Sequence, residues 1–463
     1  MNFPRLPGLH CAVALTAAML ALCVPRMIAQ SAGTGALTGI LTDPTGAVIP
    51  NVTVTLTKAD TNQARTTVTG QDGSYKFSLL PPGDYRVKFT ATGFKTAEVQ
   101  SVTINVTETP ALDRTLEVGS QSEQVTVEAT AEALQTTSST LGTVVGSRTV
   151  TALPLSTRNY TQILGLSAGT SGGVGNATAF GKGTLDLSVN GNDPGKNNFQ
   201  MDGVAVGNMT NRATSQDLYG ILTGLAIPNP DAIQEFKVQT STYDASYGRN
   251  PGANVNVVTK SGSNTFHGSA FEFFRNAQLN ANDFFYNRDT CPAFSGNCPK
   301  QILNQNQFGG TIGGPVKKDK VFFFGSYQGT RQRNGIAAEG LTSAYLPPIP
   351  AGDRRAPGFA AALAAENCGY STLLPPFLSP QLACDGSNIS PVALNILNAK
   401  NADGSYYFPG SGTDTYGQRS WSIPATHRED QVVVNGDYLI NSKNTLSGRY
   451  FYSRDPQTSP LAV

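Results

Sequence analysis

The sequence predicts a mainly β protein: a small β-sandwich, a mixed α+β segment, and then the first strands of a transmembrane antiparallel β-barrel. Three observations support this prediction. Apolar and polar residues alternate with period two in the first hundred residues after the N-terminus and again towards the end. Residues typical of turns separate these runs, and the chain starts with a short apolar segment. With 463 residues, the chain is long enough for about three domains of ~150 residues each.

The charge balance excludes a nucleic acid as partner. Lys and Arg number 33 against 32 Asp and Glu, so the net charge is +1 and the chain offers no basic footprint. Charged residues make up only 14% of the chain, well below the ~25% of typical soluble domains. With 48 Gly, 22 Phe and 16 Tyr, the composition favours an all-β surface protein with many turns over a helical enzyme.

The N-terminus predicts a cleaved signal peptide over residues 1–29. Arg5 supplies the positive charge, Cys11–Val24 is an uninterrupted apolar stretch, and Ala29 is a small residue at the expected cleavage point. The stretch is shorter than the ~20 residues of a membrane-spanning helix. A short membrane anchor is the alternative. Because no long apolar run follows, any later membrane-embedded part would have to be a closed barrel.

Four cysteines outside this segment form two local pairs, Cys291 with Cys298 and Cys368 with Cys384. An even number of closely spaced cysteines in an exported chain predicts two small disulfide loops. A metal site is disfavoured, because the chain has no C-x-x-C and no histidine near these cysteines. We therefore expect neither a metal nor another cofactor.

Residues 33–118 alternate as expected for a small antiparallel sandwich. The runs Val52–Leu56, Tyr75–Leu79 and Tyr85–Phe89 each place apolar residues on one face and polar residues on the other. Turn sequences such as Gln71–Gly73 lie between the runs.

Three stretches of this region resemble the carboxypeptidase regulatory-like domain, namely Thr38–Pro50, Asp72–Phe77 and Leu80–Tyr85. The resemblance implies a transthyretin-like, carbohydrate-binding-like sandwich, and it says little about function. The histidines of the chain are His10, His267 and His427. None of them lies in an H-E-x-x-H setting, so a zinc-peptidase site is not expected.

Residues 120–262 are predicted to form the second, α+β domain. The segment opens with Glu123–Ala129, which has an acidic start, alternating valines and a small last residue. Such a segment can pair with a partner strand by β-augmentation. It resembles the TonB box of TonB-dependent receptors, which an inner-membrane energy transducer grips. The candidate residues are Glu123, Val125, Thr126, Val127 and Ala129. The alternative is that this segment is simply the first strand of the next domain.

Further along, Pro230–Gln239 predicts a short helical turn that leads into a strand, with Asp231 placed to cap the turn. Asn254–Lys260 predicts a final strand. The long stretch Ile233–Gly262 resembles the plug domain of TonB-dependent receptors, in the Oar-like branch of that superfamily. This resemblance implies a domain that fills a barrel lumen and has to move for transport.

A possible hydrolase motif lies in the same region. Gly169–Gly173 fits G-x-S-x-G with Ser171 as the nucleophile. That motif needs a strand before it, a helix after it, and histidine and acidic partners. A glycine-rich loop follows instead, and the next histidine is His267. We therefore expect no catalytic residue and no enzyme.

Residues 264–463 predict longer, aromatic strands, each close to the ~9–11 residues of a membrane strand. The five strands are His267–Arg275, Gln305–Gly313, Lys320–Gln328, Asp430–Leu439 and Thr445–Ser453. In the fourth, Val432, Val434 and Tyr438 would face lipid. The lumen would be lined by Gln431, Asn435 and Asp437.

The connections between these strands alternate between short and long, as in outer-membrane barrels with periplasmic turns and external loops. Both cysteine pairs fall in the long loops, on the predicted cell surface. The stretch Asn306–Phe324 again resembles the start of an Oar-like barrel. A soluble β-sandwich with long insertions is the alternative. Five strands cannot close a barrel around a plug, so we expect the sequence to be truncated.

The resemblance implies a TonB-dependent receptor or transporter in the outer membrane of a Gram-negative bacterium, with the first domain in the periplasm. Its partners would be a TonB-type transducer of the inner membrane, outer-membrane lipid and a large nutrient, for which a carbohydrate is one candidate. The alternative is a surface adhesin or glycan-binding protein that does not transport.

Overall fold

The computed structural model describes residues 33–120, 139–172, 179–183, 187–206, 227–243, 251–282, 300–336, 352–368, 382–408, 424–442 and 444–459, with a few shorter stretches between them. The predicted signal peptide, Glu123, Ala129 and the pair Cys291 and Cys298 lie outside the described residues. The chain is mainly β, as predicted. Within the described ranges, no helix combines the length and the apolar character needed to cross a membrane.

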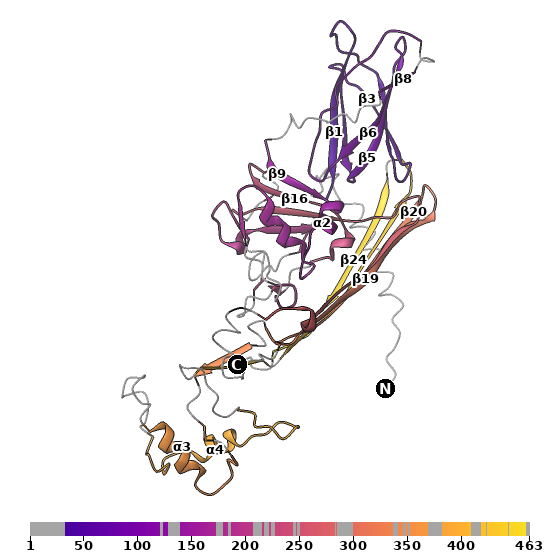
Figure 1. The fold of residues 1–463 in the computed structure, drawn as a ribbon. Coiled ribbons are helices and arrows are strands. Elements are labelled where there is room, and N and C mark those ends of the chain that lie inside the picture. The colour runs from indigo at the N-terminus through magenta and orange to yellow at the C-terminus, as the bar shows by residue number, and fades with distance from the viewer. Residues whose placement is uncertain are drawn as a thin grey trace, which may run out of the picture.

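The N-terminal unit, residues 33–120 and 124–127, consists of two sheets (Figure 1). The larger contains, in order, β3 (Ala64–Val68), β2 (Thr53–Lys58), β5 (Gly83–Thr90), β6 (Thr96–Ile104) and β8 (Gln124–Val127). The smaller contains β4 (Ser74–Leu80), β1 (Gly35–Thr42) and β7 (Arg114–Thr115).

One apolar core joins these two sheets. It takes residues of β1, β2, β4, β5 and β6, for example Leu37 of β1, Phe77 of β4 and Val87 of β5. Burying an aliphatic or aromatic side chain of this size contributes about 1.5–3 kcal/mol relative to leaving it exposed. The turn before β4 is closed by the Asp72 carboxylate, which accepts from the Ser74 amide at 3.1 Å, and by Gly73, whose φ is +69°. The alternation of apolar and polar residues and the turn-forming residues therefore both favour the fold of this unit.

The middle unit, residues 139–260, is built on a mixed sheet. Its order is β13 (Val204–Ala205), β12 (Asn198–Met201), β17 (Asn254–Thr259), β16 (Ile233–Ser241) and β9 (Leu141–Gly146). Helix α2 (Ser147–Ala152) and the 3-10 turns η1 (Tyr160–Leu166), η2 (Pro194–Lys196) and η3 (Pro230–Ala232) surround it. Two short pairs complete it, β10 (Thr170–Gly172) with β11 (Leu187–Val189) and β14 (Ser215–Gln216) with β15 (Leu222–Thr223). Ser171 lies in β10.

The structure corrects one detail of this unit. Asp231 does not cap η3, because the Asn229 side chain accepts the hydrogen bond of the Ala232 amide at 3.1 Å. Pro230 occupies the first position of the turn, where proline is favoured, so the capping residue is the one before it. The Asp231 carboxylate is free for another contact, described below.

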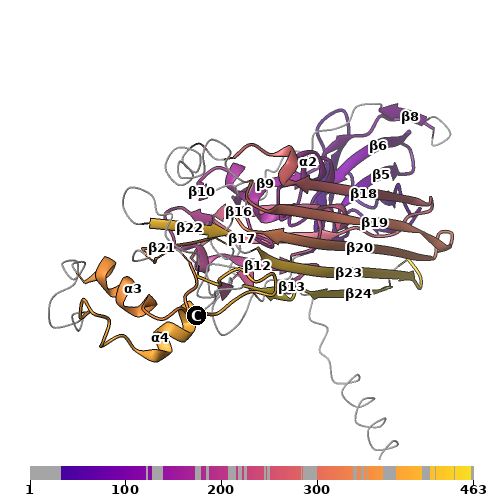
Figure 2. The same cartoon turned by 60° about the horizontal axis from the view of Figure 1, so that its bottom comes forward.

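The C-terminal sheet runs in sequence order with antiparallel neighbours (Figure 2). Its strands are β18 (His267–Asn276), β19 (Leu303–Lys317), β20 (Val321–Asn334), β23 (Ala425–Leu439) and β24 (Thr445–Arg454), and β25 (Gln457–Thr458) pairs with β23. A short turn, η4 (Ala277–Leu279), follows β18. The five predicted strands are all present, but β19, β20 and β23 extend several residues further, because their polar ends also pair in the ladder.

The long connection between β20 and β23 carries structure of its own. It contains β21 (Leu341–Tyr345) paired with β22 (Gln418–Ser422), and the helices α3 (Phe359–Asn367) and α4 (Pro391–Leu397). A disulfide joins Cys368 and Cys384, with 5.1 Å between their Cα atoms. Figure 1 shows these helices beyond one end of the C-terminal sheet, with the N-terminal unit at the other end.

Candidate functional site: the polar interface between the middle unit and the C-terminal sheet

The face of the C-terminal sheet that meets the middle unit is largely polar. Alternate residues of β20, Gln328 and Gln332 among them, are buried there, and so are Gln431 and Asn435 of β23. On the opposite face, Val434 is 48% exposed and Tyr438 is 39% exposed. Gln431 and Asn435 therefore lie on one face and Val434 and Tyr438 on the other, as the alternation predicts.

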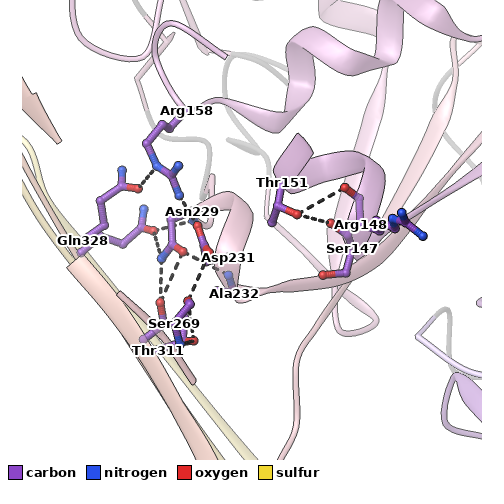
Figure 3. Close-up of polar contacts among 12 residues, drawn as sticks. Ser147, Arg148, Thr151, Arg158, Asn229, Asp231, Ala232, Ser269, Thr311 and Gln328 are labelled. Atoms are coloured by element: carbon purple, nitrogen blue, oxygen red, sulfur yellow. Dashed lines mark hydrogen bonds and ion pairs between the residues drawn. The ribbon is translucent and has the colours of Figure 1, made fainter. Parts of the chain in front are cut away.

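Arg158 makes the first connection across this interface. Its guanidinium is buried, pairs with the Asp231 carboxylate of η3, and donates from Nε to Gln328 Oε1 of β20 at 2.8 Å (Figure 3). The guanidinium also lies 4.1 Å from the ring centroid of Phe271 and 4.6 Å from that of Phe273, both in β18. One side chain of the middle unit thus contacts two strands of the sheet.

Asp231 extends this connection to the edge of the sheet. Ser269 Oγ of β18 donates to Asp231 Oδ1 at 3.2 Å, and the hydroxyls of Ser269 and Thr311 are 2.9 Å apart (Figure 3). Burial lowers the pKa of Arg158, and the charge of Asp231 opposes that shift. The pair is therefore a buried, hydrogen-bonded ion pair, of the kind in which removing one partner costs far more than the pair contributes.

Asn229 makes the second connection. Its Nδ2 donates to Ser326 Oγ of β20 at 2.9 Å, and its backbone amide donates to Gln431 Oε1 of β23 at 2.7 Å. Gln431 Nε2 in turn donates to the carbonyl of Ile227 at 2.7 Å. The same residue that caps η3 therefore anchors that turn on two strands.

A third connection lies nearer the end of the strands that faces α3 and α4. Lys182 Nζ is 3.0 Å from Glu429 Oε1, and both side chains are at most 9% exposed. Gln332 accepts from the Gly181 amide at 2.8 Å and donates to the Ala179 carbonyl at 2.9 Å. The buried ring of His427 packs edge-on against Phe180.

Apolar contact across the interface is small by comparison. The middle unit has its own core, which includes Tyr160, Phe199 and Phe236. A separate small cluster bridges the interface and contains Ala232, Phe324, Val433 and Phe451. A hydrogen bond contributes about 0.5–1.5 kcal/mol net, since water can replace a lost partner once the groups are exposed. Polar contacts therefore dominate the interface between the middle unit and the C-terminal sheet.

The N-terminal unit contacts the middle unit through strand β16. Glu235 Oε1 accepts from the Val106 amide at 2.5 Å, and Lys237 Nζ is 3.0 Å from Glu108 Oε1. Burial raises the pKa of Glu235 to about 7; Glu108 acts in the same direction, and the Val106 amide and Lys237 oppose it. This contact is therefore sensitive to pH near neutrality.

The N-terminal unit also contacts the short turns of the C-terminal sheet. Asn62 Nδ2 donates to Asp319 Oδ1 at 3.0 Å, in the turn between β19 and β20. Gln63 Nε2 donates to Thr445 Oγ1 at 3.1 Å, at the start of β24. The short connections and the N-terminal unit thus lie at the same end of the sheet.

The predicted TonB box falls partly inside the structure. Val125, Thr126 and Val127 belong to β8, the edge strand of the larger N-terminal sheet, which pairs in parallel with β6. The interface residues Arg158, Asn229, Lys182 and Glu429 were not predicted from the sequence. The sequence did contain an indication for Glu429. It is a charged residue in a strand, at a position on the face opposite the apolar side chains.

Comparison with known proteins gives a family match for two parts of the chain. Residues 36–117 match the carboxypeptidase regulatory-like domain, and residues 258–463 match an outer membrane beta barrel domain. The protein is therefore an outer-membrane protein, as predicted. It is a homologue of the TonB-dependent transporter Oar of Myxococcus xanthus, with 26% identity over 305 residues. That match covers 62% of this chain and 26% of the relative, so the chain spans about a quarter of the length of this curated protein.

Solved structures give matches of lower similarity. The outer membrane transporter YddB from Escherichia coli gives a TM-score of 0.40 at 10% identity, over 68% of this chain and 33% of that one. The ferric enterobactin receptor PfeA from Pseudomonas aeruginosa gives 0.37 at 12% identity, with the same two coverages. The curated relative Oar is a transporter, in agreement with the prediction that this chain is not an enzyme.

Proposed function

We propose that the protein is a TonB-dependent outer-membrane transporter in which the middle unit acts as the plug. The observation that carries the proposal is the contact between this unit and the C-terminal sheet. A unit with its own core docks through buried hydrogen bonds and ion pairs, and its apolar bridge is small. A plug needs this combination, because it has to stay folded while it leaves the strands that surround it. Homology to the Oar transporter supports the same function.

We further propose that Glu123–Ala129 is the TonB box and that a TonB-type transducer of the inner membrane grips it. The N-terminal unit would then lie in the periplasm, beside the short turns that it contacts. Pairing of β8 with β6 supports the ability of this segment to add to the edge of a sheet. β8 is the last strand of the larger N-terminal sheet, so the transducer would add at its outer edge, opposite β6.

This proposal is tested by binding of the transducer. The full chain in detergent would be immobilised and titrated with the purified periplasmic domain of a TonB-type transducer from the host, using interferometry. Removal of Glu123–Ala129 should abolish binding, and removal of a matched, exposed turn such as Thr45–Ala47 should not. Binding that survives loss of Glu123–Ala129 would overturn the assignment of the box.

The ligand is proposed to be a large nutrient. A carbohydrate is one candidate, supported by the resemblance of the N-terminal unit to carbohydrate-binding folds. The rival function is a surface adhesin or glycan-binding protein without transport. Photo-crosslinking in cells, from a photoreactive residue that replaces Thr126, distinguishes the transporter from the adhesin. A product that requires the transducer gene supports transport. Glycan binding without any such product supports the adhesin.

A further inference from the structure

The connection between β20 and β23 is far longer than the sheet requires. Asn334 and Ala425 pair directly with each other, so a turn of two to five residues would be enough to join these strands. Residues 335–424 lie between them instead. Part of this connection packs around its own apolar cluster, which contains Ile349, Phe359 and Leu363. We call residues 349–408 the loop unit. A long connection that builds its own core usually has a function.

A cavity of about 850 Å³ lies in the loop unit, between the start of α3 and the end of α4. Arg354 and Arg355 line it from the segment before α3, and Lys400 lines it from the segment after α4. Its lining includes no Asp or Glu. Phe359 and Leu394 contribute apolar surface. The volume is in the range of small-molecule sites, which combine apolar walls with a few polar groups.

Arg354 makes this cavity different from an ordinary gap between helices. The residue is only 4% exposed. Its Nη1 donates to the Leu397 carbonyl at 2.7 Å, and its guanidinium lies 4.1 Å from the centroid of the Tyr406 ring. In the described part of the chain it forms no ion pair with a carboxylate. Buried arginines are almost always paired with an anion, because desolvating the charge is costly.

Asp353, which precedes Arg354 in the chain, bonds to other groups. Asp353 Oδ1 accepts from the Arg355 amide at 3.1 Å and from the Tyr406 hydroxyl at 3.2 Å. Asp353 is also outside the lining of the cavity. Arg355 and Lys400 are exposed at the cavity. The hydrogen bond with the Arg355 amide lowers the pKa of Asp353, and the charges of Lys400 and Arg355 lower it further. Lys400 Nζ also lies 4.7 Å from the Tyr406 ring centroid. Together with Arg354, these cations outnumber the one neighbouring acid. The cavity is therefore positively charged and partly apolar.

We propose that this cavity binds a small organic anion with an apolar body, such as an aromatic carboxylate. The anionic group would lie between Arg355 and Lys400, with the buried guanidinium of Arg354 behind them. The apolar body would pack on Phe359 and Leu394. The competing explanation is that Arg354 only stacks on Tyr406 and binds the last turn of α4, in which case the cavity has no preference for charge.

The test is calorimetric titration of the purified full chain in detergent, with empty micelles as the blank. The two probes are 1-naphthoate and 1-naphthamide, which share a ring system and differ in charge. We expect saturable binding of naphthoate, and binding of the amide weaker by about tenfold or more, which corresponds to about 1.4 kcal/mol. Equal affinities, or no saturation by naphthoate up to about 10 mM, would overturn the proposal.

Variants assign the binding to this cavity. Arg355→Gln with Lys400→Gln changes two exposed side chains and should weaken naphthoate binding by about tenfold or more. Lys318→Gln, an exposed cation in the turn after β19, is the matched control and should leave binding unchanged. Unaltered affinity in the double variant would place the probe elsewhere and contradict the proposal. The titration does not involve the transducer, so its failure is distinguishable from failure of the transport function.

Discussion

Two regions of this molecule bury similar kinds of strands in different ways. In the N-terminal unit, the inward residues are apolar and both sheets share one core. Between the middle unit and the C-terminal sheet, the inward residues are mostly Gln, Asn, Ser and Thr, with two buried ion pairs. Apolar burial joins parts that remain together, whereas polar burial joins parts that can separate once water replaces the lost bonds. The predictions below test this contrast.

The largest effect is expected in the apolar core. Phe89 is fully buried, and its ring packs edge-on against Tyr75 at 5.8 Å. Phe89→Ala should lower the free energy of unfolding of the N-terminal unit by about 3–5 kcal/mol, because it leaves a cavity. Urea titration followed by limited proteolysis measures the loss. Val68→Ala, at a site that is 52% exposed, is the control. A loss below about 1 kcal/mol for Phe89→Ala would contradict the assigned core.

The next effect concerns the buried ion pair between Lys182 and Glu429. Lys182→Met leaves the Glu429 carboxylate buried without its cation and should weaken docking of the middle unit by about 3 kcal/mol. Hydrogen exchange of η3 would report the loosened contact.

A second substitution provides an internal check of this ion pair. Adding Glu429→Gln to Lys182→Met should recover most of the loss, since no unpaired charge remains. Lys88→Met, at an exposed site, should have no effect on exchange in η3. If the double variant loosens the contact more than the single one, the explanation by an unpaired charge is wrong.

The contact of Glu235 should depend on pH. Its pKa in the structure, about 7, is above the ordinary value, so the protonated form is favoured when the two units are docked. The contribution of Glu235 to docking is fully present below about pH 4.5 and is lost as the pH rises through 7. Above that pH, docking does not change further with the titration of this group. We expect docking to weaken by about 1–3 kcal/mol between pH 5 and pH 8.

Proteolysis of the connection between the N-terminal and middle units, measured across this pH range, checks the prediction. Glu235→Gln should remove the dependence on pH and retain docking at pH 8. Glu117→Gln, which alters an exposed ion pair with Lys95, is the matched control. A pH profile that Glu235→Gln does not change would assign the effect to another group.

The smallest effect is expected at Asn229. Asn229→Ala removes the cap of η3 and the bond to Ser326, and should loosen the interface by about 1–2 kcal/mol. Hydrogen exchange of Ile227–Ala232 measures it. Gln100→Ala, which removes an exposed hydrogen bond to Glu98, should leave exchange in this segment unchanged. Equal protection from hydrogen exchange in Asn229→Ala and Gln100→Ala would show that Asn229 does not hold η3 in place.

The sequence predicted the features that depend on neighbours in the chain. Alternation in β23 assigned Gln431 and Val434 to opposite faces, because side chains of a strand alternate whatever it packs against. The strand ends were less predictable, since residues such as Arg333 lack the aromatic pattern and still pair in the ladder.

The contacts between the middle unit and the C-terminal sheet could not be predicted from the sequence. Arg158 and Asp231 are separated by 73 residues, and Arg158 and Gln328 by 170, so no local pattern connects them. The expected cap at Asp231 failed for a local reason, because Pro230 moved the cap to Asn229. Asp231 then became available to Arg158, a consequence that only the folded arrangement reveals.

The most direct test of the contrast is cysteine labelling in increasing urea. Ser326→Cys lies in β20 under the middle unit, where Ser326 is 5% exposed, and Val87→Cys lies in the N-terminal core, where Val87 is fully buried. A maleimide reagent would be applied to each variant, with the parent chain as background. We predict that Ser326→Cys becomes reactive at a lower urea concentration than Val87→Cys, because the middle unit leaves the sheet before the N-terminal unit unfolds. Reaction of both sites at the same urea concentration would contradict a releasable interface.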